Sequence, residues 1–269
     1  MIVFLLFAAL IGQLAYLQII HGPKFESEAT SSDNQTETRN VQRGTIYDST
    51  GKLLVANNTS RAITYTKPLN VASSQMYKVA NNLVNYVSVE TDTLTERNKV
   101  DYYLADPKHT AAVNKHIPNA DTMQDNEKLT KLQTNYVKKH NLVKKMSEKQ
   151  EQAAVLYAKM AGAYALSTVY LKTSDVSDSE MAEVGEHLSL LPGVKIGTSW
   201  SRSYPNGESV KSVIGTVTSE KQGLPSDQIN KLLAEGYSRN DSVGSSYIES
   251  QYENALKGTK EVINVQTQN

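Results

Sequence analysis

The chain has 269 residues, and its 28 lysine and arginine residues balance its 28 aspartate and glutamate residues. A net charge of zero gives no global field that would attract nucleic acid, so no nucleic-acid partner is expected. Because cysteine is absent, disulfide frameworks, thiolate metal sites and cysteine nucleophiles are excluded.

The N-terminal stretch is the most apolar part of the chain. Residues 2–20 carry no charge and, as a helix, would cross roughly 28 Å before Gly22-Pro23 ends them. A cleaved signal peptide would have a shorter apolar core, a basic segment before it and a small-residue cleavage site after it. We therefore expect residues 1–22 to form a single-pass anchor in the cell membrane, with the bulk of the chain extracytoplasmic. Residues 23–40 are polar and are expected to form a tether leading into an extended strand near 38–42.

A β-hairpin is predicted just after the tether. One strand is expected to end at 46–47 and the next to begin at 53–55. Between them, Asp48 can accept hydrogen bonds from the backbone ahead of it, and Gly51 can adopt a positive φ without steric cost. The alternation of apolar and polar residues over 61–66 predicts a third strand.

The middle of the chain, about 70–162, reads as a helical insertion. Residues 76–87 keep the 3, 4, 7 spacing of one apolar helix face. The capping-box spacing of Thr93–Glu96 predicts a second helix. Residues 108–146 have sparse apolar positions and are expected to be helical and exposed. Ser147, followed three residues later by a glutamine, predicts another helix start.

Short elements alternate over the rest of the chain. Since strands and helices come in blocks, without a regular β-α-β alternation, the predicted fold class is α+β. Strands are expected at 164–172, 194–204 and 262–266, and helices after Ser177, after Pro225 and along a face made by Ile248, Tyr252 and Leu256.

No catalytic constellation stands out. The five histidines form no H-E-x-x-H pair, and no G-x-S-x-G or Walker motif is present. Ser49-x-x-Lys52 fits the S-x-x-K acylation motif, and residues 32–34 fit S-D-N. However, Ser49 is expected in a hairpin turn rather than at a helix start, the two motifs come in reversed order, and K-[ST]-G is missing. We expect no catalytic residue, no metal and no cofactor.

Four ordered landmarks carry a family resemblance. After the apolar N-terminal stretch come Arg43-Gly44-x-Ile46-x-Asp48-x-x-Gly51-x-x-Leu54, then Arg202-Ser203-Tyr204-Pro205-Asn206-Gly207 with Ile214-Gly215-x-Val217, and finally Gly244-Ser245-Ser246-Tyr247-Ile248-Glu249-x-x-Tyr252-x-x-x-Leu256-x-Gly258. Together they resemble the membrane anchor and pedestal, or dimerisation, region of class B penicillin-binding proteins. Residues 94–107 and 236–244 are similar to the proteins of Gram-positive cocci within that family.

The resemblance implies a role in cell-wall synthesis. Members of the family are D,D-transpeptidases that crosslink peptidoglycan through an acyl-serine intermediate, which β-lactams trap, in a domain that follows the pedestal. This sequence stops where that domain should begin, so residues 41–269 are expected to be a non-catalytic pedestal domain. The implied partners are the membrane, the transpeptidase domain of the full-length protein, cell-wall synthesis proteins such as a glycan polymerase, and a second copy in a possible homodimer.

The resemblance also implies which residues lie near the junction with the transpeptidase domain: Arg43, Asp48, Arg202 and Glu249. Either arginine can form a bidentate pair with Glu249 or Asp48; the alternative is exposed ion pairs worth about 0–1 kcal/mol. The remaining structural-motif residues are Gly44, Gly51, Tyr204, Gly215, Gly244, Tyr252 and Gly258.

The sequence allows a comparison with two other functions. A stand-alone membrane-anchored adaptor or sensor of the cell-wall machinery would use the same α+β body to recruit partners. It is distinguished from a pedestal by whether the coding frame continues into S-x-x-K, S-x-N and K-[ST]-G. A glycan-acting enzyme has no supporting carboxylate or metal constellation.

Overall fold

The structure is a computed structural model whose chain divides into two compact units, residues 1–41 with 258–269 and residues 42–257. Among the residues that it describes, no helix is both long enough and apolar enough to span a membrane. The expected anchor and most of the expected tether lie outside the described residues, which are 34–39, 42–219, 222–237, 241–258 and 261–266.

In the first unit, two strands from distant parts of the chain form an antiparallel pair. β1 (Asn34–Arg39) lies against β6 (Glu261–Gln266), with Asn34 opposite Gln266 and Arg39 opposite Glu261. The extended segment expected at 262–266 is therefore confirmed. The extended strand predicted near 38–42 begins earlier, at Asn34, because a strand more than 200 residues later supplies the backbone partners that a polar sequence does not reveal.

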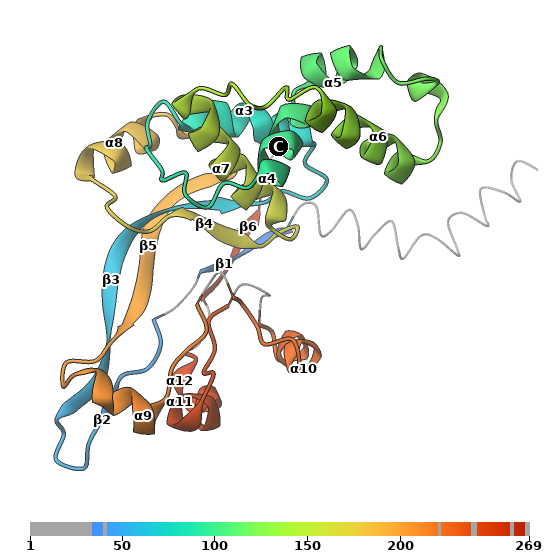
Figure 1. Ribbon diagram of the computed structural model, residues 1–269. Coiled ribbons are helices and arrows are strands. Elements are labelled where there is room, and N and C mark those ends of the chain that lie inside the picture. Colours follow the sequence, from blue (N-terminus) through green and yellow to red (C-terminus); the bar gives the residue numbers. More distant parts are fainter. Residues whose placement is uncertain (1–33, 40–41, 220–221, 238–240, 259–260, 267–269) are drawn as a thin grey trace, which may run out of the picture. The chain divides into compact units, whose positions relative to one another are not determined.

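The second unit is built on one long strand. β3 (Leu53–Thr66) pairs with β2 (Ile46–Tyr47), β4 (Thr168–Lys172) and β5 (Val194–Ser203), all antiparallel. Figure 1 shows β3 and β5 side by side, and their register runs from Ala56 opposite Ser203 to Tyr65 opposite Val194.

The two strands expected at 53–55 and 61–66 are thus one strand, which corrects the sequence prediction. Residues 57–60 are polar and mostly exposed, so they lack the apolar alternation of a strand. The β5 ladder continues across them and holds the backbone extended. The strand expected over 164–172 is shorter at its start, because residues 164–167 form a turn in which the Ser167 N–H donates to the Tyr164 carbonyl.

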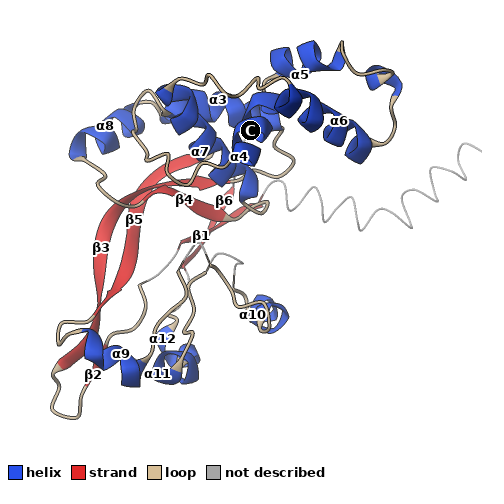
Figure 2. Cartoon of the chain, in the orientation of Figure 1, coloured by secondary structure: helices blue, strands red, loops and turns tan. Residues whose placement is uncertain are grey.

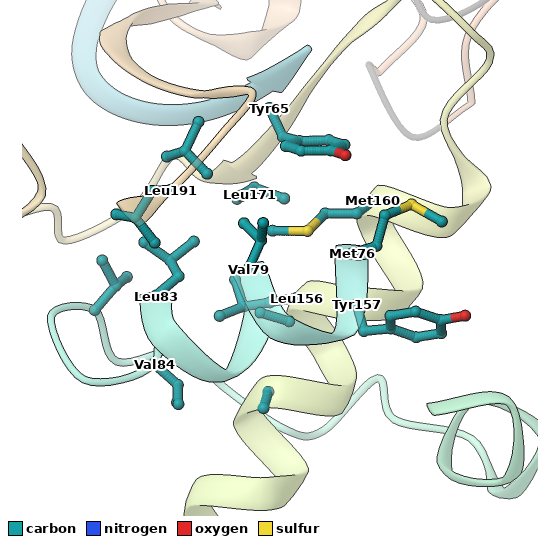
Figure 3. Packing of buried hydrophobic residues seen from close by; sticks show 14 of the residues in the cluster. Tyr65, Met76, Val79, Leu83, Val84, Leu156, Tyr157, Met160, Leu171 and Leu191 are labelled. Atoms are coloured by element: carbon teal, nitrogen blue, oxygen red, sulfur yellow. The ribbon is translucent and has the colours of Figure 1, made fainter. Parts of the chain in front are cut away.

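Helices cover one end of this sheet (Figure 2). They are α3 (Ser73–Leu83), α4 (Glu96–Ala105), α7 (Glu148–Gly162) and α8 (Asp178–Glu186), with a 3₁₀ turn η2 (Leu188–Leu190) after α8. Figure 3 shows apolar side chains of α3 (Val79, Leu83) and α7 (Leu156, Met160) gathered in one cluster with Leu171 of β4. The apolar face predicted over 76–87 is confirmed as the core face of α3 and the residues that follow it.

Two predicted helix starts are confirmed. Ser147 with Gln150, and Ser177 with Glu180, form capping boxes at α7 and α8. The start predicted for α4 is wrong by two residues: Thr95 is the N-cap, and its hydroxyl accepts from the Asn98 N–H at 3.2 Å. A turn closed by the Leu94 N–H and the Thr91 carbonyl delays the helix.

The segment after α4 forms a small helical subdomain with α5 (Pro107–Asn114), η1 (Ala120–Thr122) and α6 (Asn126–Lys139). The prediction of an exposed helical segment is correct for its polar residues. Its few apolar residues nevertheless converge on a core of their own, made by Val100, Val113, Ile117, Ala120, Val137 and Val143.

The last part of the second unit is a series of short helices: η3 (Glu208–Val210), α9 (Lys211–Ile214), α10 (Ile229–Ala234), α11 (Tyr247–Gln251) and α12 (Glu253–Leu256). The single helix face predicted for Ile248, Tyr252 and Leu256 is wrong. The chain leaves the helical conformation at Tyr252 (φ −102°, ψ 23°), whose side chain is exposed while Leu256 is buried.

Candidate functional site

The predicted hairpin forms as expected and brings Arg43 and Gly44 into the fold. Asp48 accepts from the backbone N–H groups of Thr50 (2.8 Å) and Lys52 (2.9 Å), and Gly51 has a φ of 83°. Hydrogen bonds from the Thr50 hydroxyl and the Lys52 backbone lower the pKa of Asp48. Asp48 is therefore engaged in the turn, and of the two carboxylates proposed as arginine partners it is Glu249 that pairs.

Arg43 instead joins two carboxylates from the far end of the unit. Its Nε donates to Glu249 Oε2 at 2.6 Å, and its Nη2 donates to Glu253 Oε2 at 2.6 Å and to the Glu249 carbonyl at 2.9 Å. The side chain of Arg43 is 2% exposed and that of Glu249 is 0% exposed. The alternative of an exposed ion pair is therefore wrong for these two residues.

Arg202, at the end of β5, approaches Glu249 with two nitrogens. Its Nε lies 2.9 Å from Glu249 Oε1, but the two atoms form an ion pair without the geometry of a hydrogen bond. Its Nη2 donates a hydrogen bond to Glu249 Oε2 at 3.2 Å. Its Nη1 donates to the Gly44 carbonyl (2.8 Å) and to Asn57 Oδ1 (2.9 Å). Arg202 thus makes one hydrogen bond and one further charge contact with Glu249, short of the bidentate pair predicted from the sequence, whereas Arg43 bridges two acids.

Glu253 is the member that sequence reasoning missed. Its Oε1 accepts from the Tyr237 hydroxyl at 2.9 Å, and its Oε2 accepts from the Gly244 N–H at 2.7 Å as well as from Arg43. The available signal was its position four residues after Glu249, which places two carboxylates on one side of a helical segment. Asn57, which also donates to the Arg43 carbonyl at 2.6 Å, lies in a polar stretch that gave no signal.

We call Arg43, Arg202, Glu249 and Glu253 the buried charge network. Burial works against the charge of Arg43, but hydrogen bonds and charges of Glu253 and Glu249 outweigh it and raise its pKa. Burial lowers the pKa of Arg202, against the opposing effect of Glu249. Burial would raise the pKa of Glu253, but the Arg43 and Gly244 hydrogen bonds hold it below its ordinary value. With two cations and two anions, the network has no net charge and joins three separate segments of the chain, around Arg43, Arg202 and 249–253.

Two glycines let the backbone approach closely beside this network. Gly215 has a φ of 94°, and a Cβ there would lie 2.1 Å from the Ser246 carbonyl oxygen. A Cβ on Gly244 would lie 2.1 Å from the Glu249 carbonyl oxygen. Tyr204 donates from its hydroxyl to the Gly215 carbonyl at 3.1 Å, and burial raises its pKa.

The structure therefore brings together part of the predicted motif set. Gly44 belongs to the group too, since its N–H donates to the Leu256 carbonyl at 2.8 Å. Gly51 stays in the hairpin turn with Ser49, Tyr252 is exposed, and Gly258 (φ 68°) belongs to the other unit. The members that meet are Arg43, Gly44, Arg202, Tyr204, Gly215, Gly244 and Glu249.

Comparisons with known proteins agree with the motif resemblance. A family model described as the penicillin-binding protein dimerisation domain matches residues 38–269. Penicillin-binding protein 2A of Bacillus subtilis is 37% identical over 264 residues, 96% of this chain and 36% of that protein. Penicillin-binding protein 2B of Streptococcus pneumoniae strain D39 is 33% identical over 265 residues, 97% of this chain and 39% of that protein.

A solved structure of a penicillin-binding protein is also similar to this chain. Penicillin-binding protein 2B from Streptococcus pneumoniae strain 5204 matches with a TM-score of 0.65 and 30% identity, over 87% of this chain and 39% of that one. The chain thus spans about two fifths of the length of these relatives. It belongs to the penicillin-binding protein dimerisation-domain family.

Proposed function

We propose that this chain is the non-catalytic, membrane-anchored pedestal of a class B penicillin-binding protein. In this role it holds a downstream D,D-transpeptidase domain outside the membrane, where that domain crosslinks peptidoglycan. The proposal extends from the family match to the whole protein, because relatives of this chain are more than twice as long.

The buried charge network is the observation that carries the proposal. Each of its carboxylates is held by arginine or by backbone and hydroxyl donors, and Glu249 is fully buried. A general base or nucleophile must reach a substrate, whereas the partners of these groups are other groups of the same unit. Such an arrangement fits a rigid support for a neighbouring domain better than it fits chemistry.

An exposed apolar surface lies on the same short helices. Val213 on α9, Tyr247 on α11 and Tyr252 after it are 64%, 66% and 57% exposed. α9 and α11 are neighbours, since Gly215 at the end of α9 meets Ser246 at the start of α11. Adjacent exposed apolar side chains are typical of an interaction surface. We propose that the transpeptidase domain, and partner proteins of wall synthesis, rest on this part of the pedestal.

Two experiments test the proposed function. Reading the gene past codon 269 is expected to show S-x-x-K, S-x-N and K-[ST]-G in this order, and a stop codon there would contradict the pedestal. Incubating the 269-residue chain with fluorescent penicillin is expected to give no covalent label. Labelling at Ser49 would overturn the non-catalytic assignment.

A further inference from the structure

The helical subdomain carries a concentration of positive charge in a chain that is neutral as a whole. Residues 128–147 contain six lysines, one histidine and no acidic residue. They include most of α6 and the connection to α7. This charge is not required by the buried charge network or by the proposed transpeptidase contact, so it calls for an explanation of its own.

The lysines face solvent along one side. Lys128, Lys131, Lys138 and Lys139 are all exposed on α6 and, at 100° per residue, fall within an arc of about 100°. The buried residues of that helix, Gln133 and Val137, lie on its other side. Two more exposed lysines, 144 and 145, continue the charge beyond the helix end.

Acidic side chains do not neutralise the end of this stripe. Lys131 pairs with Glu127, but Lys138, Lys139, Lys144 and Lys145 have no acidic partner among the described residues.

Three acids next to the subdomain are engaged elsewhere. Asp101 pairs with Arg97 at 2.9 Å, and Glu151 pairs with Lys99. Asp106 caps α5 by accepting from the Lys108 N–H. The positive charge therefore remains available to a partner.

The composition of this surface narrows the kind of partner. Apolar residues of α5 and α6 are used in the subdomain's own core, so they are not free to insert into a bilayer or to anchor a protein interface. Tyr136 packs against the rings of His116 and His140, so the surface offers little aromatic area for stacking on bases. Lysines supply flexible point charges, which suit phosphate groups of variable geometry.

We propose that the lysine stripe (Lys128, Lys131, Lys138, Lys139, Lys144 and Lys145) binds a linear polyol-phosphate polymer, whose phosphodiester charges repeat along the chain. The inference rests on the proposed function, from which it takes the extracytoplasmic location of this domain. At that location the phosphate polymer is expected to be a polymer of the cell wall rather than nucleic acid. Binding is electrostatic, follows the stripe and leaves the polymer chemically unchanged. It would hold the pedestal within the anionic layer of the envelope.

The test uses the purified full chain in a neutral detergent and end-labelled poly(glycerol phosphate) as the probe. Fluorescence anisotropy is measured between about 25 and 200 mM salt. With four to six phosphates contacted, the logarithm of the association constant is expected to fall with the logarithm of the salt concentration with a slope of about −3 to −5. The triple variant Lys139→Gln, Lys144→Gln, Lys145→Gln should reduce that slope by about 2 and weaken binding at low salt at least about tenfold.

A matched control comes from exposed lysines elsewhere in the chain. Lys52→Gln, Lys78→Gln, Lys231→Gln removes the same charge and should leave the slope unchanged. Circular dichroism melting confirms that both triple variants stay folded. No binding by the wild type, or an equal loss in both variants, overturns the proposal. The proposal is also overturned if phosphatidylglycerol micelles displace the labelled polymer at a lower phosphate concentration than unlabelled polymer does. That result would identify a lipid surface as the binding partner. These outcomes are independent of penicillin labelling and of the gene sequence past codon 269, which test the proposed function.

Discussion

Arg43 and Glu249 are 206 residues apart in the sequence, yet the Arg43 Nε donates to Glu249 Oε2 at 2.6 Å with both side chains buried. The contact ties the segment before the first hairpin to a helix near the end of the second unit. Since Glu249 also meets Arg202, removal of this one carboxylate would leave two buried guanidinium groups with fewer partners. The stability of the region should therefore depend strongly on Glu249.

The first prediction concerns this carboxylate. Glu249→Gln should lower the free energy of unfolding by about 3–5 kcal/mol, because breaking one side of a buried ion pair leaves uncompensated charge. Chemical denaturation of the full chain measures it. The control is Glu127→Gln, which removes an exposed partner of Lys131 and should cost at most about 0.5 kcal/mol. Equal effects of the two substitutions would contradict the account.

The second prediction concerns pH. The pKa of Glu253 is lowered in the folded state, whereas an unfolded glutamate titrates near about 4.3. Its charged form therefore contributes stability that is complete above that pH and is lost as the pH falls through the folded pKa. The stability advantage of the wild type over Glu253→Gln should be constant near neutral pH and shrink below about pH 4.3. Denaturation curves from pH 3 to 7 test this, and an advantage that grows in acid would refute it.

The third prediction separates backbone strain from crowding at two glycines. Gly207 (φ 92°, ψ 165°) and Gly215 (φ 94°, ψ −168°) have nearly the same conformation. A Cβ at Gly207 meets nothing within 4 Å, whereas one at Gly215 lies 2.1 Å from the Ser246 carbonyl oxygen. Gly207→Ala should cost about 1–3 kcal/mol through strain alone. Gly215→Ala should cost about 1–3 kcal/mol more through overpacking, and similar melting temperatures for the two variants would argue against the close approach.

Much of the local structure could be predicted from the sequence. The hairpin around Asp48 and Gly51 was predictable because turn chemistry is decided by a few neighbouring residues. The capping boxes at Ser147 and Ser177 were predictable for the same reason. The apolar face of α3 followed from its spacing alone.

What could not be predicted depends on partners distant in the sequence. The continuity of β3 across its polar middle comes from β5, and the strand β1 exists because β6 pairs with it. Within the network, Arg43 and Glu249 were identified as candidates, but Asp48 was an equally plausible partner until the structure showed its Oδ1 accepting three hydrogen bonds within the turn. Glu253 was missed because its partner Arg43 lies 210 residues away in the sequence.

The fourth prediction concerns the exposed surface on α9 and α11. In the full-length protein, Tyr247→Ser with Tyr252→Ser should lower the melting temperature of the transpeptidase domain, because the surface that supports it is removed. The matched control is Leu69→Ser with Tyr164→Ser, which are 55% and 53% exposed in another part of the unit. Calorimetry that shows the same transitions in both variants would rule out the contact.

The most direct test of the central claim, that this chain positions chemistry performed elsewhere, compares two activities of the full-length protein carrying Glu249→Gln. The account predicts that acylation by a labelled penicillin stays near the wild-type rate, since that reaction needs only the transpeptidase site. Crosslinking of peptidoglycan strands should fall about tenfold or more, because displacement of the site by about 1 Å can cost about 10²-fold. Wild-type crosslinking together with an unchanged melting temperature would contradict the claim.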